Sequence, residues 1–273
     1  MADSNFMSDT DTHPSYGRLG AIVAVALVAA LLVLLTQAPA SFLATAVRAW
    51  SHGRLELGDA SGTVWQGQAT LILTPGERNA GTRTRLPGQT AWRLEAWQLL
   101  FGSLNLTLSN TAVLDAPLSL RMDRSRNATV DASRLHLPAD VLVGLGAPWN
   151  TIQPGGDLAL EWDTLHVASN SVRGELRGEW SGASSRLSPI VPFGHYRVVA
   201  QGIFPGAQVR LETLSGPMEM VGSGTIEDGN HLRFRGTAQV QPGTDATVAT
   251  QLSGLISLLG PRNGDGATIN IGI

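Results

Sequence analysis

From residue 55 onward, apolar and polar residues alternate with a period of two along most of the chain. Trp92, Leu94 and Ala96, for example, alternate with Arg93 and Glu95. Because successive side chains of a strand point to opposite faces of a sheet, this pattern predicts strands with one apolar and one polar face. The same alternation recurs in segments 104–108, 118–122, 158–162, 165–167, 172–180, 196–200, 218–226, 232–240 and 269–273.

Glycine and proline separate these segments and predict turns between them. Pro-Gly pairs occur at 75–76, 87–88, 154–155 and 205–206, and such pairs are typical of tight turns. Asp228-Gly229 predicts a hairpin between two strong strands. We therefore expect a mainly β domain, built as an antiparallel, strongly curved sheet or as a sandwich-like arrangement, with one or two short helices.

Two segments of the β domain carry helical rather than strand spacing. Residues 137–142 predict a short helix with Pro138 in its first turn. Between 248 and 259 the apolar residues recur at helical spacing, and Thr244 or Asp245 can cap the helix that they predict. Residues 41–50 also predict a short helix.

The segment 19–35 reads LGAIVAVALVAALLVLL and contains no charged residue. Extended to residue 38, it is long enough to cross the hydrocarbon core of a bilayer as a helix. Ala38-Pro39-Ala40 resembles a signal-peptidase site, but the apolar run is longer than a typical signal sequence. We therefore expect a cytoplasmic tail over 1–18, a retained transmembrane anchor over 19–38 and a periplasmic β domain over 39–273.

Composition narrows the classes of function. The chain has 273 residues, enough for one large or two small domains. Its formal net charge is −3 and every basic residue is Arg, scattered along the chain, which argues against a nucleic-acid partner. The chain contains no Cys, so disulfides, thiolate nucleophiles and Cys-based metal sites are excluded.

The sequence contains no recognisable catalytic motif. The six His residues are isolated, and neither a G-x-S-x-G motif nor a phosphate loop is present. Asp157, Glu161 and Asp163 lie close together on a predicted strand, where a solvated face is the simpler interpretation. We expect no enzymatic activity, no cofactor, and no catalytic, cofactor-binding or metal-binding residues.

A Trp-x-Gly motif occurs twice, at 65–67 and at 180–182, and suggests two related halves over about 54–135 and 136–273. In a strand, Trp65 and Gly67 share a face, so we expect the glycine to leave room for that indole. We assign these residues, with further glycines of the predicted strands, a structural role. The set is Gly62, Trp65, Gly67, Trp180, Gly182, Gly216, Gly222, Gly224 and Gly236.

Several stretches carry a family resemblance. They are SGTVWQGQATL at 61–71, AWRLEAW at 91–97, the run 211–240, and LLGPRNGDGATINIGI at 258–273. Together with the short tail and single anchor, their order and spacing resemble the type II secretion system protein N family over nearly the whole chain. One departure is Thr225-Ile226, which follow Gly224 where the family pattern would have an aromatic residue.

The resemblance implies an accessory component of the machine that exports folded proteins across the outer membrane. Its partners would be other type II secretion components in the inner membrane and periplasm, and membrane lipid through the anchor. The resemblance implies neither enzymatic activity nor a cofactor. A second hypothesis is an envelope lipid-binding or lipid-transfer protein, in which the apolar strand faces line a β-groove of AsmA type. An ordinary packed core is the other use of those faces.

Overall fold

The computed structural model describes most of the chain and divides it into two units, Met1–Ala38 and Pro39–Ile273. The described residues are 22–27, 29, 33, 36–76, 81–99, 101–147, 149–168, 171–227, 231–264 and 266–272.

In the first unit, the described residues 22–27, 29, 33 and 36 are helical, and the amide of Gln37 donates to the carbonyl of Val33. No helix among the described residues is long and apolar enough to cross a membrane. The predicted tail, 1–18, and much of the predicted anchor, 19–38, lie outside the described residues. Both therefore stay predictions.

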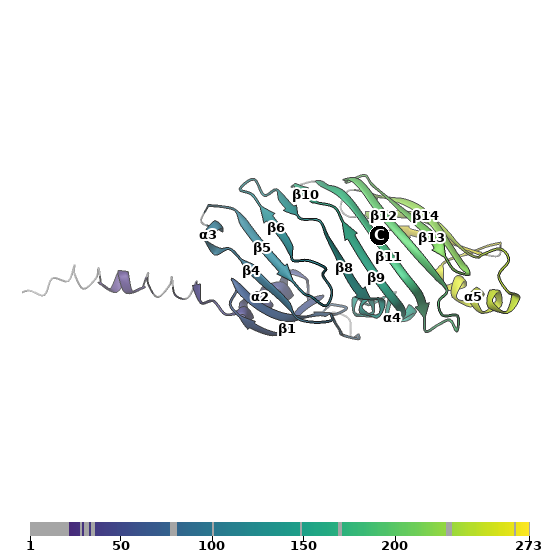
Figure 1. Cartoon of the computed structure of the whole chain (residues 1–273), viewed down its shortest axis with the longest axis horizontal. Helices are drawn as coiled ribbons and strands as arrows, with labels where there is room; N and C mark the ends of the chain where they lie inside the picture. Colours follow the sequence, from purple (N-terminus) through teal and green to yellow (C-terminus); the bar gives the residue numbers. More distant parts are fainter. Residues whose placement is uncertain are drawn as a thin grey trace, which may run out of the picture. The chain divides into compact units, whose positions relative to one another are not determined.

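The second unit is built on one antiparallel sheet, which among the described residues has seventeen strands. Their positions agree with the alternating segments of the sequence, which confirms a mainly β, antiparallel fold (Figure 1). The strands are β1 (Leu55–Gly62), β2 (Gln66–Leu73), β3 (Thr84–Arg85), β4 (Thr90–Leu94), β5 (Leu104–Ser109), β6 (Leu118–Met122), β7 (Ala128–Val130), β8 (Ser133–Pro138), β9 (Pro154–Trp162), β10 (Leu165–Ala168), β11 (Ser171–Ser185), β12 (Gly194–Phe204), β13 (Ala207–Ser215), β14 (Met218–Glu227), β15 (His231–Val240), β16 (Arg262–Asn263) and β17 (Gly266–Gly272).

The sheet is a long meander in which neighbours in space are mostly neighbours in sequence. β1 pairs with β2, β2 with β4, and β4, β5, β6 and β7 follow in turn. β7 and β8 pair with β10 and β9, and both of these pair with the long strand β11. From β11 the order continues through β12, β13, β14 and β15 to β17. The turn residues 228–230, where a hairpin is predicted, lie outside the described residues, but the strands on either side of them pair.

The prediction of a strongly curved or sandwich-like β domain is wrong. The described strands form a single sheet that is neither strongly curled nor closed. Closure would require the first and last strands to pair. Instead, among the described residues, β1 pairs with β2 alone, and β17 pairs with β15 and β16. The alternating pattern predicts strands and faces, but it contains no information on curvature.

Few helices accompany the sheet. The predicted helices at 41–50 and 248–259 are confirmed as α2 (Ala40–Trp50) and α5 (Ala246–Leu259). The side chain of Asp245 caps α5 by accepting from the amide of Thr247 at 2.8 Å. The helix predicted at 137–142 is the 3-10 helix η1 (Ala139–Leu145), which begins just after Pro138. The single-turn helices α3 (Ala96–Leu99) and α4 (Trp149–Ile152) were not predicted, because one turn carries too few residues to show a helical period.

Strand register gathers the apolar side chains on one face of the sheet. Residues directly opposite each other in paired strands share a face. Trp92 lies opposite Leu108, Leu176 opposite Ala200, and Val198 opposite Leu211. The polar residues of the same strands consequently occupy the opposite face.

Two helices cover parts of the apolar face. α2 packs near one end, in a cluster whose buried members are Ala40, Ala69 and Trp92. α5 packs at the other end, where its buried Leu252, Leu255 and Ile256 lie against residues of the last strands, including Met218 and Ala238. Full burial of each large aliphatic side chain contributes about 1.5–3 kcal/mol, so α5 is held mainly by this contact.

Candidate functional site: a charged hollow on the polar face

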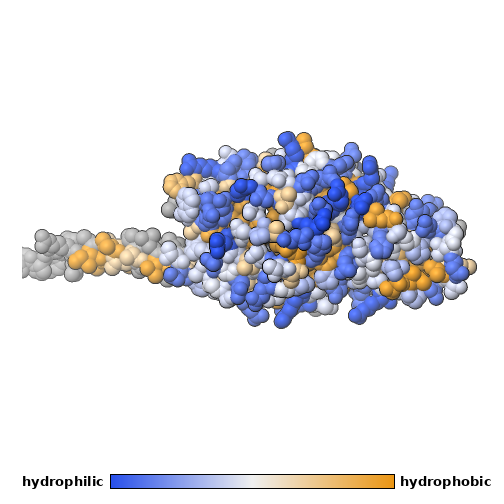
Figure 2. Space-filling view, viewed as in Figure 1, coloured by the Kyte–Doolittle hydropathy of each residue, from blue (hydrophilic) through white to orange (hydrophobic). Residues whose placement is uncertain are grey.

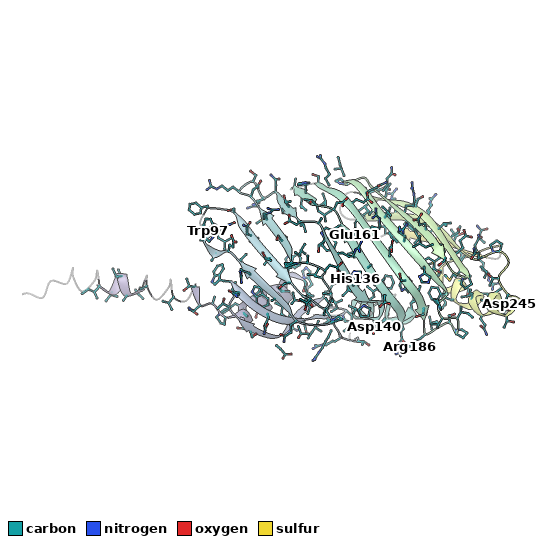
Figure 3. All side chains as sticks on the ribbon, viewed as in Figure 1. Trp97, His136, Asp140, Glu161, Arg186 and Asp245 are labelled. Carbon is teal, nitrogen blue, oxygen red and sulfur yellow. The ribbon has the colours of Figure 1, made fainter. Side chains whose placement is uncertain are left out.

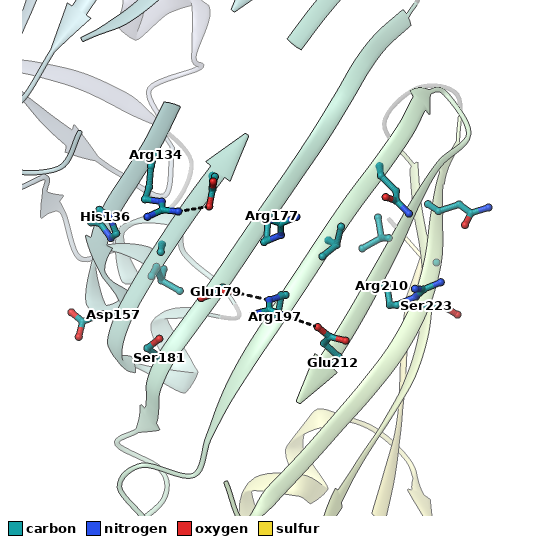
Figure 4. Close-up of a pocket in the computed structure, with 18 of the residues that line it drawn as sticks. Arg134, His136, Asp157, Arg177, Glu179, Ser181, Arg197, Arg210, Glu212 and Ser223 are labelled. Atoms are coloured by element: carbon teal, nitrogen blue, oxygen red, sulfur yellow. Dashed lines mark hydrogen bonds and ion pairs between the residues drawn. The ribbon is translucent and has the colours of Figure 1, made fainter. Parts of the chain in front are cut away.

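The polar face of the sheet is hollowed over strands β8, β9, β11, β12, β13 and β14 (Figure 4). The hollow has a volume of about 1030 Å³. Alternate residues of each strand point into it, so charged side chains from five of the six strands meet there, while β14 contributes uncharged residues. Figure 2 shows hydrophilic side chains spread over the strands, with smaller orange areas among them. The charged residues of the hollow are Arg134, His136, Asp157, Glu161, Arg177, Glu179, Arg197, Arg210 and Glu212.

Strand register places opposite charges next to each other across the hollow. Arg134 on β8 lies opposite Glu161 on β9, and Glu161 lies opposite Arg177 on β11. The Nη2 atom of Arg134 is 2.6 Å from Oε2 of Glu161. Arg177 makes its own ion pair with Glu175 of the same strand, at 2.8 Å. One row of the hollow is therefore a ladder of alternating sign.

A second row is centred on Arg197 of β12. Its Nε atom lies 2.8 Å from Oε1 of Glu179 on β11, and its Nη1 atom lies 3.2 Å from Oε1 of Glu212 on β13. These residues are directly opposite each other in the two strand pairs. One guanidinium thus joins three strands, using the planar, many-donor geometry that distinguishes Arg from Lys.

The ion pairs also shift the pKa values of the side chains that make them. The hydrogen bond and charge of Glu161 raise the pKa of Arg134, and Arg134 in turn lowers the pKa of the Glu161 carboxyl. The hydrogen bond that Arg197 donates to Glu179 raises the pKa of Arg197. All of these side chains are partly exposed, and pairs of this kind contribute little to stability. Their main effect is to orient fixed charges on an accessible surface.

Three of the four carboxylates that line the hollow are paired with arginines. Each carboxylate of Glu161, Glu179 and Glu212 is held by an arginine, so none is placed as a free base. Within the part of the chain that the structure describes, no group of three or more His, Cys, Asp or Glu residues could hold a metal ion. Asp157 and Glu161, which the sequence analysis placed on a solvated face, both line the hollow.

Sequence reasoning did not find the hollow, because its charges come from five strands spread along the sequence from Arg134 to Glu212. The alternation Arg173, Glu175, Arg177, Glu179 in β11 was the available signal. A strand that alternates charge sign on one face needs neighbouring strands with the complementary signs. That pairing is decided by register rather than by any single strand.

Gly67, one of the predicted motif residues near β2, packs against Trp92 rather than against Trp65. Gly67 lies directly opposite Trp92, and a Cβ atom added to Gly67 would come within 2.5 Å of Cζ2 of that indole. Gly62 has φ +90, at the end of β1. Trp65 is half-buried in the turn before β2, so it is not part of the strand. The sequence analysis expected Gly67 to accommodate Trp65; the ring that it accommodates is that of Trp92.

The second Trp-x-Gly motif has a different local structure. Trp180 lies within β11, donates from Nε1 to the carbonyl of Gly155 at 2.9 Å, and packs edge-on against Phe193. Gly182 has φ +61 at a register shift of β11, and its amide donates to Nδ1 of His195. The two motifs therefore occupy unlike positions. The division into halves at about 54–135 and 136–273 stays a prediction.

Three of the four remaining motif glycines lie against one residue, Phe234. Gly222 and Gly236 lie opposite each other, and a side chain on either would meet the ring of Phe234. Gly224 lies directly opposite Phe234, against its backbone. Gly216 has φ +118 and closely approaches the backbone of Gly194. As at Gly67, glycines on the apolar face let an aromatic ring lie flat across a neighbouring strand.

The fold and the hollow define a class of protein: an antiparallel β-sheet protein with one apolar face and one charged face suited to binding. Residues 53–270 match the family described as type II secretion system (T2SS), protein N. The chain belongs to the type II secretion system protein N family, and is thus a component of that secretion system. No curated protein and no solved structure matches the chain.

Proposed function

We propose that the protein is a non-enzymatic accessory component of the type II secretion system, anchored in the inner membrane. The segment 19–38 is the anchor, residues 1–18 lie in the cytoplasm, and the β domain, 39–273, lies in the periplasm. The family supports the secretion role. The uncharged apolar run 19–35 supports the anchor.

The charged hollow is the surface through which the β domain binds another component of the system. The single observation that carries this proposal is the row Glu179–Arg197–Glu212, which fixes three charges on an accessible face. A partner with complementary charges gains specificity and a faster association from such a pattern. Because the charges are already paired within the chain, the partner meets an ordered surface and loses little further side-chain entropy.

Site-specific photo-cross-linking in intact cells tests the docking surface. The cross-linker replaces Gln208, an exposed residue of β13 that lines the hollow. The matched control is Gln239, an exposed residue of β15 outside the residues that line the hollow. We expect position 208 to capture another type II secretion component and position 239 to capture less of it. Equal capture at the two positions would count against the hollow.

Membrane topology is tested separately by cysteine labelling, because the natural chain contains no Cys. Ser4→Cys lies in the proposed cytoplasmic tail, and Leu258→Cys lies on an exposed site of α5. A membrane-impermeant maleimide that passes only the outer membrane should label position 258 and leave position 4 unlabelled until the inner membrane is opened. Labelling of both positions in intact cells would contradict the proposed orientation.

A second candidate function, an apolar groove that binds envelope lipid, is favoured by one observation. In the middle of the apolar face, between the clusters under α2 and α5, the large side chains are only partly buried. An apolar face left partly open is a feature of binding surfaces. The residues of this central strip are Leu120, Leu160, Leu176 and Val198.

Lipid extraction from the purified full-length chain, followed by mass spectrometry, tests the groove. Leu176→Glu places a charge in the central strip, and Arg173→Glu, on the polar face of the same strand, is the matched control. A groove predicts that lipid co-purifies with the control and is reduced in Leu176→Glu. Equal lipid in both variants would show that bound lipid surrounds the anchor alone.

A further inference from the structure

A cluster of exposed apolar residues projects from the connection between β4 and β5. Trp97, Leu99 and Phe101 are 60%, 41% and 55% exposed. The rings of Trp97 and Phe101 meet edge to face, with their centroids 5.9 Å apart. These three residues, on and just after α3, form what we call the aromatic tip. Figure 3 shows Trp97 at the end of the sheet farthest from α5.

The aromatic tip lies at the end of the sheet where the chain enters the β domain. Pro39, the residue before α2, forms a β-bridge with Thr63 in the turn between β1 and β2. In the same turn, the carbonyl of Trp65 accepts a hydrogen bond from the amide of Leu94 at 2.6 Å. α3 begins two residues after Leu94. A short chain of backbone contacts thus connects the first residue of the domain to the tip.

Other exposed groups at this end have the chemistry of a membrane interface. Phe42, in the first turn of α2, is 65% exposed. Arg124, in the turn between β6 and β7, donates from Nε to the carbonyl of Phe101. Arg126 is exposed in the same turn. Two acidic groups lie nearby and are hydrogen-bonded by amides: Glu95 accepts from Gln98 and Asn105, and Asp123 accepts from Asn127.

We propose that the aromatic tip inserts into the headgroup layer of the membrane that holds the anchor. Indole rings and apolar side chains beside arginines favour this layer, where the rings leave water and the guanidinium groups meet lipid phosphates. The proposal rests on the proposed anchor at 19–38. Pro39, the first residue of the domain, follows that segment directly in the sequence.

The test uses the full-length chain reconstituted in vesicles of phosphatidylethanolamine and phosphatidylglycerol. Trp97→Cys carries an environment-sensitive fluorophore, and Leu258→Cys on α5, which is 64% exposed at the far end of the sheet, carries the same one. We expect blue-shifted emission at position 97 and several-fold stronger quenching by lipids spin-labelled near the headgroup than at position 258. Equal, water-like emission at both positions would overturn the proposal.

Further arms separate this proposal from its alternatives. Arg126→Gln, which leaves the hydrogen bond from Arg124 to Phe101 intact, should weaken the quenching at position 97 when phosphatidylglycerol is present and have no effect in vesicles without anionic lipid. If position 97 is protected in cells but exposed to water in vesicles, the tip binds a protein and the lipid proposal falls. If carbonate releases the chain from the vesicles, the anchor fails and the tip proposal fails with it. If the chain stays in the vesicles after carbonate treatment but the tip is exposed to water, the tip proposal falls while the proposed anchor stands.

Discussion

The indole ring of Trp92 lies against Gly67 across the pairing of β2 with β4. A Cβ atom at Gly67 would come within 2.5 Å of both Cζ2 of Trp92 and the carbonyl oxygen of Ser61. The ring is buried, and its Nε1 donates to the carbonyls of Thr63 and Val64 at 3.2 and 3.1 Å. The indole is therefore fixed on one side by hydrogen bonds and on the other by a residue without a side chain.

Substitution of Gly67 should consequently destabilise the domain. Gly67→Ala forces the indole or the β1–β2 backbone to shift, and overpacking of this kind costs about 1–3 kcal/mol. Thermal unfolding of the full-length chain in detergent measures the effect. Gly178→Ala is the matched control, because it is also a strand glycine of the apolar face and its added Cβ would meet its nearest neighbour at 3.5 Å. Equal melting temperatures for the two variants would contradict the role of Gly67.

Tyr196 should make the domain sensitive to alkali. Its hydroxyl is buried and donates to the carbonyl of Met218 at 2.9 Å, and burial raises its pKa. The unfolded chain ionises this tyrosine near its ordinary pKa of about 10, whereas the folded chain keeps it protonated. Stability is thus fully present below about pH 10 and falls above it, by up to about 1.4 kcal/mol per pH unit, until the folded group ionises.

Urea unfolding of the full-length chain between neutral pH and pH 11 measures this loss. The chain has no Lys or Cys and two Tyr residues, so few other groups titrate in the range. Tyr196→Phe should abolish most of the alkaline loss while lowering stability at neutral pH by about 1–3 kcal/mol, because the Met218 carbonyl loses its donor. Tyr16→Phe, outside the described residues, should keep the full alkaline loss. An unchanged loss in Tyr196→Phe would assign it to another group.

Asp245 should make α5 sensitive to acid. Its side chain accepts from the amide of Thr247, and that hydrogen bond lowers the pKa of the carboxyl. A lowered pKa contributes stability that is present above the unfolded value and is lost as pH falls through the folded value. Asp245→Ala should lower the melting temperature at neutral pH, with a smaller difference from the unsubstituted chain in acid. Asp245→Asn retains the cap and should lose less at neutral pH.

Arg197 should affect binding more than stability. Its partners Glu179 and Glu212 are accessible to water, so Arg197→Gln leaves no buried charge and should shift the melting temperature only slightly. The same variant removes the positive charge between Glu179 and Glu212, so both carboxylates lose their partner. It should therefore reduce cross-linking from position 208. Arg233→Gln, whose ion pair with Glu227 is outside the residues that line the hollow, is the control. If only Arg233→Gln reduced the cross-linking, the docking surface would lie near Arg233 and not in the hollow.

Local sequence rules predicted the elements well and their partners less well. Period-two alternation located the main strands, and Asp245 marked the start of α5, because both signals act within a few residues. Gly67 was predicted to make room for the indole of Trp65. The indole came from Trp92 on the neighbouring strand rather than from Trp65, since nearness across a sheet depends on register.

By itself, the sequence determined that each strand has an apolar and a polar face, because side-chain direction follows from backbone geometry alone. It also determined the family, through short motifs in a characteristic order. Only the tertiary structure decided that the sheet stays open, that Arg197 joins Glu179 to Glu212, and that backbone contacts connect the point where the chain enters the domain to the strand before the aromatic tip. These relationships join residues far apart in sequence, and the pairing of whole strands brings them together.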